Sequence, residues 1–259
     1  GKLPAAERVV PHWGFDIRKP GEAYSASLFQ EYARTCFADI DARGKRCVLA
    51  GGTGFYVRAA IDDYDFASGE QVDNLVREKW AAFLAEHGSQ ALWDALNERD
   101  AESAAIIHPN NSKRVVRALE MLELDGVSYA SQHEGLATLG QAVPALFFGL
   151  LVDPGLLKKR INARVDSMFE AGLVDEVRAL CEQGFTEALT AREAIGYKEV
   201  VAALEGRCSM EEASEAIKLA TRRYAKRQRS WWRHDERVRW VAADDGDVAR
   251  MADEIQQLL

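Results

Sequence analysis

Residues 47–56 read "CVLAGGTGFY". A short apolar run, which predicts a strand, leads into a turn that holds three glycines, Gly51, Gly52 and Gly54, around the hydroxyl of Thr53. Glycines allow the backbone of such a turn to approach a ligand closely. The stretch therefore predicts a strand followed by a loop that can contact a ligand.

The loop matches neither of two common nucleotide-binding patterns. A P-loop, G-x-x-x-x-G-K-[ST], needs a lysine after its last glycine, and the spacing G-x-G-x-x-G of dinucleotide sites is absent as well. What remains is a nest of backbone N–H groups around Thr53, which can hold an anion and give it one directed hydrogen bond. A tight connection without a ligand has the same pattern, so the loop alone leaves both interpretations open.

The other periodic segments predict an α/β protein. A helix is expected to begin near Ser25, where Ser27 and Gln30 fit a capping box, and to end at Gly44. A helix followed by a strand indicates α/β packing, and a continuous apolar run is typical of a strand covered on both faces. The expected elements are strands at Cys47–Ala50, Ala145–Asp153 and 238–243, and helices within 70–130, 155–182 and 196–233.

Charge is distributed unevenly along the 259 residues. The net charge is −8, which argues against general attraction to nucleic acid. Between Lys218 and Arg239, however, nine Lys or Arg residues face only Asp235 and Glu236, a local balance of 9 − 2 = +7. A basic stripe on an acidic protein indicates a positioned contact with a polyanion.

Composition excludes several classes of protein. No stretch approaches the roughly 18 consecutive apolar residues of a membrane helix, and the first residues lack the apolar core of a signal peptide. The four cysteines show no C-x-x-C spacing, which is typical of isolated reduced thiols in the cytoplasm. The expectation is one large cytoplasmic domain, or one domain with an insertion.

Five motifs, in this order, resemble those of the tRNA dimethylallyltransferases, also called tRNA isopentenyltransferases. They span Val10–Trp232 and read "VPHWGFDIRKPGEAYSASLF", "GGTGFY", "HPNNSKRVVRALE", "REAIGYKE" and "TRRYAKRQRSWWR". Small departures from the family pattern are Trp13-Gly14 for His-Leu, Asn111 for Asp and Ser230 for Thr. The lack of a zinc-finger tail resembles the bacterial type.

The resemblance implies a P-loop-kinase-like parallel sheet flanked by helices. An α/β catalytic core would comprise residues 1–69 and 139–259, and an all-helical insertion over 70–138 would contact tRNA. The family begins with a P-loop and a segment that supplies a catalytic aspartate, and neither occurs here. Since "GKLP" at Gly1 resembles a later family turn, this chain is expected to start some tens of residues downstream of the family's start, without the first strand.

The implied reaction moves a dimethylallyl group from dimethylallyl diphosphate to the exocyclic amine of the adenosine 3′-adjacent to the anticodon of tRNA. It needs a base near the amine, cationic stabilisation of the diphosphate and a base removed from its stack. The implied partners are the tRNA anticodon stem-loop and the diphosphate, with Mg²⁺ as cofactor, no metal ligands in this chain, no membrane and a monomeric state.

The resemblance also assigns roles to individual residues. Thr53 and Arg192 would be catalytic, and the loop would be a diphosphate-contact loop, not an ATP loop. Gln228 could read a base edge, and Trp231 or Trp232 could stack on an unpaired base, although one tryptophan is expected in the core. His12 is either a substrate-side or a structural residue. The diphosphate-binding residues would be Gly51, Gly52, Thr53 and Gly54; the tRNA-binding residues would be Arg77, Lys113, Arg114, Arg117, Arg192, Gly196, Tyr197, Lys226, Arg227, Gln228, Arg229, Trp232 and Arg233.

Two other functions stay open at this point. An adenylate isopentenyltransferase, which modifies a free nucleotide, shares the chemistry but needs neither a basic C-terminal helix nor a central helical insertion. An inactive RNA-binding fragment would keep the basic helix without the P-loop. A G-x-x-x-x-G-K-[ST] segment encoded just before Gly1 would identify an enzyme.

We expect the 259-residue chain by itself not to transfer a prenyl group, because the P-loop and the aspartate are not among its residues. The measurement is a transfer assay on an anticodon stem-loop with dimethylallyl diphosphate and Mg²⁺. Turnover equal to that of an N-terminally extended chain would contradict this expectation.

Overall fold

The computed structural model describes residues 8–19, 22, 24–66, 74–137, 139–187 and 191–259. The chain forms two compact units, Gly1–Val57 with Pro144–Leu259 and Arg58–Val143. The second unit is wider at both ends than the expected insertion over 70–138. The reason is that the chain segments leading into and out of it are hydrogen-bonded to each other: the carbonyl of Ile61 accepts from Ala142 N at 2.9 Å and from Val143 N at 3.0 Å.

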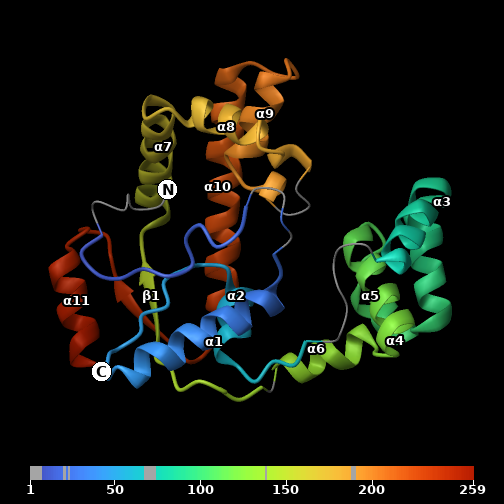
Figure 1. The fold of residues 1–259 in the computed structure, drawn as a ribbon, viewed down its shortest axis with the longest axis horizontal. Coiled ribbons are helices and arrows are strands. Elements are labelled where there is room, and N and C mark those ends of the chain that lie inside the picture. Colours follow the sequence, from blue (N-terminus) through green and yellow to red (C-terminus); the bar gives the residue numbers. More distant parts are fainter. Residues whose placement is uncertain (1–7, 20–21, 23, 67–73, 138, 188–190) are drawn as a thin grey trace. The chain divides into compact units, whose positions relative to one another are not determined.

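The first unit contains a parallel two-stranded sheet of β1 (Phe147–Leu151) and β2 (Val238–Ala242), which confirms two of the expected strands. Phe147 lies opposite Val238, and Gly149 lies opposite Trp240. Helix α11 (Val248–Gln257) packs against β2, as Figure 1 shows. The sequence separation between the strands permits the parallel pairing, since a parallel pair needs a long crossover connection.

The expected strand at Cys47–Ala50 does not form. Residues 45–53 carry no strand assignment, and Val48 is 85% exposed. A strand exists only where a neighbour accepts and donates its ladder hydrogen bonds, and within the described residues no strand pairs with this segment. The apolar run was therefore a wrong signal for a strand of the sheet.

Helices make up most of the first unit, and their packing buries a core around α10. Ser25 is the N-cap of the first helix, because its side chain accepts a hydrogen bond from Leu28 N at 3.2 Å, so the expected cap at Ser27 is wrong. Buried apolar residues of α7 to α10, including Val165, Val177 and Ile217, pack together. The helices are α1 (Ala26–Ala42), α2 (Gly54–Ile61, which continues into the second unit), α7 (Pro154–Glu170), α8 (Leu173–Cys181), α9 (Tyr197–Leu204) and α10 (Met210–Trp232), with short 3₁₀ turns η2 (Phe185–Glu187) and η3 (Ala191–Glu193).

The second unit is helical in its described part and has its own core. Trp80, Leu92 and Leu119 are buried in it, between α3 and α5. Helix α3 bends at Gly88, whose φ of 82° is one that glycine adopts without strain. Its helices are α3 (Leu75–Arg99), α4 (Ala101–Ile106), α5 (Ser112–Asp125) and α6 (Tyr129–Ala137). No helix in the described part of the chain is long and apolar enough to cross a membrane.

A buried carboxylate joins α3 to α5. Glu120 is fully buried, and it accepts hydrogen bonds from Arg77 Nη2 at 2.7 Å and from Asn74 Nδ2 at 2.8 Å. Arg117 Nη1 lies 3.1 Å from Glu120 Oε1, the same carboxylate oxygen that Asn74 binds. Asn74 also caps α3, since its side chain accepts from the backbone N–H groups of Val76 and Arg77. The carboxylate thus orients the beginning of α3 on α5.

Glu120→Ala should destabilise the protein by about 3–5 kcal/mol, because two partly buried guanidinium groups would lose their counter-charge. The control is Glu86→Ala on α3. Its side chain is 77% exposed and lies 3.7 Å from His87 Nε2, so its loss should cost at most about 1 kcal/mol. Urea unfolding of both variants measures the difference, and equal losses would show that burial of Glu120 does not matter.

Candidate functional site

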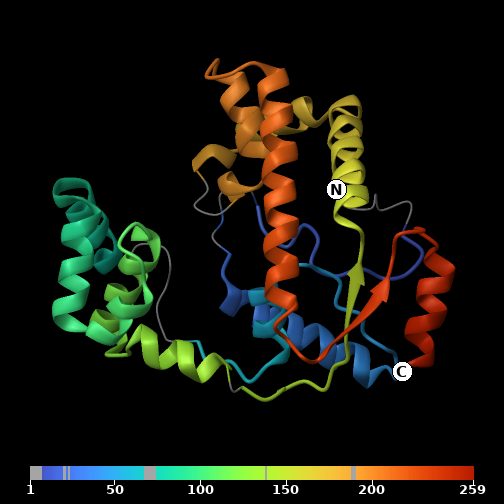
Figure 2. The ribbon, with the colours of Figure 1, turned by 180° about the vertical axis from the view of Figure 1, so that it is seen from behind.

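The glycine loop rests on one face of α10. The hydroxyl oxygens of Thr53 and Tyr224 lie 2.8 Å apart, within hydrogen-bond distance, although 171 positions separate them in sequence. Figures 1 and 2 both show the beginning of α2, which follows this loop, beside the C-terminal half of α10. The loop is therefore attached to the helix by a side-chain contact at its only hydroxyl.

Two glycines of the loop allow this close approach. A Cβ at Gly52 would collide with the side-chain amide of Gln228, and a Cβ at Gly54 would collide with the indole of Trp231. A Cβ at Gly51 would meet no atom within 4 Å. The glycines at 52 and 54 are thus explained by packing against α10, whereas the one at 51 is not.

The residues of α10 that hold the loop form one stripe. Tyr224, Gln228 and Trp231 follow each other at spacings of four and three, which places them on one face of a helix with 3.6 residues per turn. The same spacing continues backward through Thr221 and Ile217. One face of α10 therefore runs from the core of the first unit to the glycine loop.

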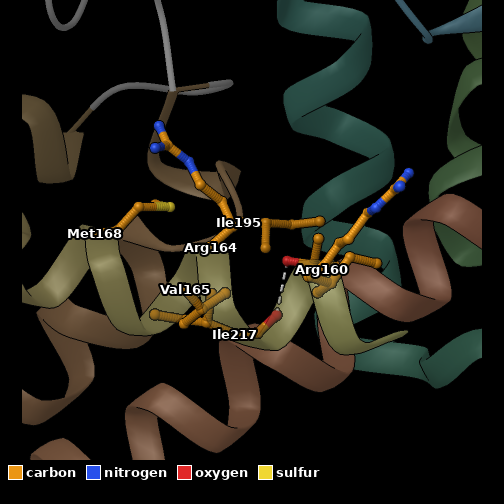
Figure 3. A pocket seen from close by; sticks show the side chains of 8 residues that line it. Arg160, Arg164, Val165, Met168, Ile195 and Ile217 are labelled. Atoms are coloured by element: carbon orange, nitrogen blue, oxygen red, sulfur yellow. Dashed lines mark hydrogen bonds between the residues drawn. The ribbon is translucent and has the colours of Figure 1, made fainter. Parts of the chain in front are cut away.

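A cavity of about 290 Å³ lies on this same stripe, between α7 and α10. Its walls include the apolar side chains of Val165, Met168 and Ile195, and Ile217 and Thr221 contribute from α10. In Figure 3 the guanidinium groups of Arg160 and Arg164 point away from the apolar side chains. Arg160 donates to the carbonyl of Ala243 at 3.0 Å, which fixes one edge of the cavity to the end of β2.

The basic stripe divides into residues used internally and residues that face solvent. Lys218 pairs with Asp166 at 2.7 Å, and Arg222 donates to Asn162 at 2.9 Å. Arg237 pairs with Asp235, and Arg239 donates to a main-chain carbonyl. The other five members are all exposed: Arg223, Lys226, Arg227, Arg229 and Arg233. The exposed charge is therefore concentrated on α10.

These exposed cations lie mostly away from the loop. At about 100° per residue, Lys226, Arg229 and Arg233 fall on the face of α10 roughly opposite Tyr224. Arg227 flanks the loop side, and its guanidinium carbon lies 5.7 Å from the centre of the Tyr224 ring. One helix thus offers a cationic face to solvent and a second face to the glycine loop.

The aromatic and amide residues near the end of α10 lie against protein. The ring of Trp232 is half-buried, with its centre 6.0 Å from that of Phe147 on β1. Trp231 is 46% exposed but covers Gly54, and Gln228 is half-buried against Gly52. Both tryptophans therefore contribute to packing, Trp232 against β1 and Trp231 against the glycine loop, and stacking on RNA stays a prediction for this pair.

The motif that contains Arg192 forms a turn before α9. Arg192 is exposed in η3, and Gly196 is buried with a φ of 100°, where a side chain would be strained. The hydroxyl of Tyr197 donates to the carboxylate of Glu176, and burial together with this hydrogen bond raises the pKa of Tyr197 to about 12. Tyr197 thus stays protonated at neutral pH and has a structural partner.

Four predicted RNA contacts lie in the second unit. Lys113 and Arg114 are exposed on the first turn of α5. Arg77 and Arg117 share Glu120, and their side chains keep 27% and 31% exposure. Their guanidinium groups are therefore held in place by a carboxylate and remain in part accessible.

Two further expectations concern His12 and metal ions. The Nδ1 atom of His12 lies 2.7 Å from the carbonyl of Val10, and its ring stacks on Phe15 at 5.7 Å, so it has structural partners. Among the described residues, no group of three or more His, Cys, Asp or Glu side chains could hold a metal ion.

Tyr224 is the site residue that sequence reasoning did not assign. The sequence contains a signal for it, which is the four–three spacing from Ile217 to Trp231. Such spacing indicates a packed helix face, but it does not say that a glycine loop is what covers this face.

Comparison with known proteins gives a consistent result. Residues 1–235 match the family model described as IPP transferase. The tRNA dimethylallyltransferase of Carboxydothermus hydrogenoformans is 40% identical over 253 residues, which is 98% of this chain and 81% of that protein. The enzyme of the same name from Bacillus licheniformis is 43% identical over 89% of this chain and 73% of its own length.

Two solved structures are similar over 99% of this chain. One is the full-length tRNA isopentenylpyrophosphate transferase from Bacillus halodurans, with a TM-score of 0.68, 36% identity and 80% of its chain covered. The other is a eukaryotic dimethylallyltransferase acting on tRNA, with a TM-score of 0.78, 25% identity and 67% of its chain covered.

Gly54→Ala should destabilise the first unit by about 1–3 kcal/mol, the usual cost of overpacking, because its Cβ meets the rigid indole of Trp231. Gly52→Ala should cost less, since the amide end of Gln228 can move, and Gln228→Ala should rescue it. Gly51→Ala is the matched control and should change stability by less than about 0.5 kcal/mol. Thermal unfolding measures all four variants, and equal losses at 51 and 54 would contradict the packing seen here.

Proposed function

This chain belongs to the IPP transferase family, and on that premise we propose how its residues serve the transfer of a dimethylallyl group to tRNA. This is the activity for which its relatives are named. The donor in this proposal is dimethylallyl diphosphate, and the acceptor is the exocyclic amine of the adenosine 3′-adjacent to the anticodon. A protein with a tRNA substrate is proposed to act in the cytoplasm.

The observation that carries the proposal is the packing of the glycine loop against α10. The loop offers backbone N–H groups and the Thr53 hydroxyl, which can both donate hydrogen bonds to an anion. The same helix carries exposed arginines and lysines, which suit RNA phosphates. An anionic donor and a polyanionic acceptor would thus be held by two faces of one rigid element.

The chemistry assigns Thr53 to the leaving group. The amine nitrogen forms a bond to the allylic carbon, the bond from this carbon to the diphosphate oxygen breaks, and the electron pair leaves with the diphosphate. A hydrogen bond from Thr53 to the leaving oxygen strengthens as negative charge builds up there. The proton released by the amine needs a base, which the family pattern places in the aspartate segment before residue 1.

Magnesium enters the proposal with the diphosphate. Mg²⁺ keeps several waters and is usually bound through substrate phosphates with one or two carboxylates. The ion would neutralise the diphosphate charge, and the roles given to Thr53 and α10 do not depend on it.

Positions in both units are proposed to contact the anticodon stem-loop. On α10 these are Lys226, Arg227, Arg229 and Arg233, which are exposed. On α5 they are Lys113 and Arg114, also exposed, with Arg77 and Arg117 held by Glu120. Because the remainder of the chain is acidic, attraction to RNA must come from these local groups.

In the active enzyme, Thr53→Ala should lower kcat by about 10²–10³, as loss of an oxyanion donor does, with a smaller change in KM. The measurement is steady-state transfer to a stem-loop with dimethylallyl diphosphate. Thr35→Ala is the matched control, because Thr35 is exposed and its hydroxyl donates to the main-chain carbonyl of Glu31 within α1. An unchanged kcat with only KM raised would mean that the loop binds without assisting departure.

Neutralising Arg227 and Arg229 together should weaken RNA binding. The slope of the logarithm of the binding constant against the logarithm of the salt concentration should fall in magnitude by roughly 1 to 1.5, since each phosphate contact to single-stranded RNA contributes about 0.7. The loss should be similar for matched and mismatched loops, because phosphate contacts position but do not specify. Removing two exposed arginines elsewhere, Arg178 and Arg207, is the control for net charge. Titration of a labelled stem-loop at several salt concentrations measures this slope; a slope like the parent's would mean that these two arginines are only solvated surface groups.

A further inference from the structure

The hydrogen bond between Thr53 and Tyr224 has a direction that a bound anion would impose. Each hydroxyl has one proton to donate and lone pairs to accept with. A diphosphate oxygen can only accept, so Thr53 can bond to it only by donating its single proton. Thr53 must then accept from Tyr224, whose hydroxyl oxygen lies 2.8 Å away.

We propose that Tyr224 is a positioning residue for the transfer reaction, which directs the proton of Thr53 toward the leaving diphosphate. The inference rests on the proposed function and adds a residue to it. With Tyr224 donating, the Thr53 proton cannot point back at the helix and is available to the anion. Hydrogen bonds in such a chain polarise each other, so the bond from Thr53 to the anion also gains strength.

The surroundings of Tyr224 fit a positioning role. Its ring is half-buried, with the guanidinium carbon of Arg227 5.7 Å from the ring centre. The loop residues on either side of Thr53 also lie against α10, Gly52 against Gln228 and Gly54 against Trp231. Thr53 lies between two glycines that are both seated on α10, so its hydroxyl has little freedom to leave Tyr224.

The energetic gain would come from preorganisation. In water, a hydroxyl rotates freely and must be ordered before it can stabilise developing charge. A hydroxyl oriented in advance requires no such ordering when the bond breaks. Loss of Tyr224's hydroxyl would therefore affect kcat, and it would act only through Thr53.

The test uses Tyr224→Phe, which removes one oxygen, in the active enzyme. We expect kcat to fall about three- to thirtyfold, the effect of one hydrogen bond, with KM within about twofold. In a Thr53→Ala background the same substitution should cause no further fall, because the group through which it acts is gone. Tyr24→Phe is the matched control: its hydroxyl is buried in the same unit and has no hydrogen-bond partner among the described residues.

Several results would overturn the proposal. A Tyr224→Phe variant with the parent's kcat would do so. Equal falls in kcat with and without Thr53 would do so as well, because they indicate a general effect on the fold. A fall in kcat matched by Tyr24→Phe would have the same meaning.

A second measurement separates this inference from the proposed function. Inorganic pyrophosphate, which is the leaving group itself, is titrated in the presence of Mg²⁺ into four forms of the active enzyme. These are the parent without substitutions, Tyr224→Phe, Thr53→Ala and the double variant. Weaker binding in Tyr224→Phe, together with no further loss when the same change is added to Thr53→Ala, supports the positioning role even if no transfer to tRNA is found. Parent-like affinity in Tyr224→Phe, or no binding to the parent, overturns it. A parent that binds pyrophosphate but transfers nothing contradicts the proposed function alone.

Discussion

The contact between the glycine loop and one face of α10 is the constraint on which the candidate site depends. A hydrogen bond joins Thr53 to Tyr224 across 171 positions, and Gly52 and Gly54 lack the Cβ atoms that would separate loop from helix. Without this contact the loop would be an exposed turn. With it, the backbone and the hydroxyl of the loop take a defined place, which preorganised anion binding requires.

Helix α10 also provides local positive charge on an acidic protein. A chain with a net charge of −8 repels RNA as a whole. Part of the basic stripe is neutralised internally, as Lys218 is by Asp166, and the exposed remainder lies on α10. Because a helix fixes the angle between its faces, the distance from RNA phosphates to the donor loop would be set by α10 alone. The cations that attract the RNA would therefore also fix its position relative to the glycine loop.

The second unit shows how partly buried cations can be retained for contact. Glu120 is fully buried and would be costly alone, but Arg77, Arg117 and Asn74 all bond to it. Such a network contributes little net stability compared with apolar packing. Its benefit is geometric, because two long side chains that would otherwise sample many rotamers are held at the surface between α3 and α5.

The sequence by itself determined whatever depends on local pattern. Periodicity and apolar runs identified the helices and the strands β1 and β2, and the ordered motifs identified the family. Tertiary structure alone decided matters that need a distant partner. The Cys47–Ala50 segment forms no strand because no strand in the described residues pairs with it, and Trp232, not Trp231, packs on β1. Tyr224 belongs to the site because the fold brings a loop onto its face of α10. Hydrogen bonding and packing act across space, whereas periodicity records only which face of an element is covered.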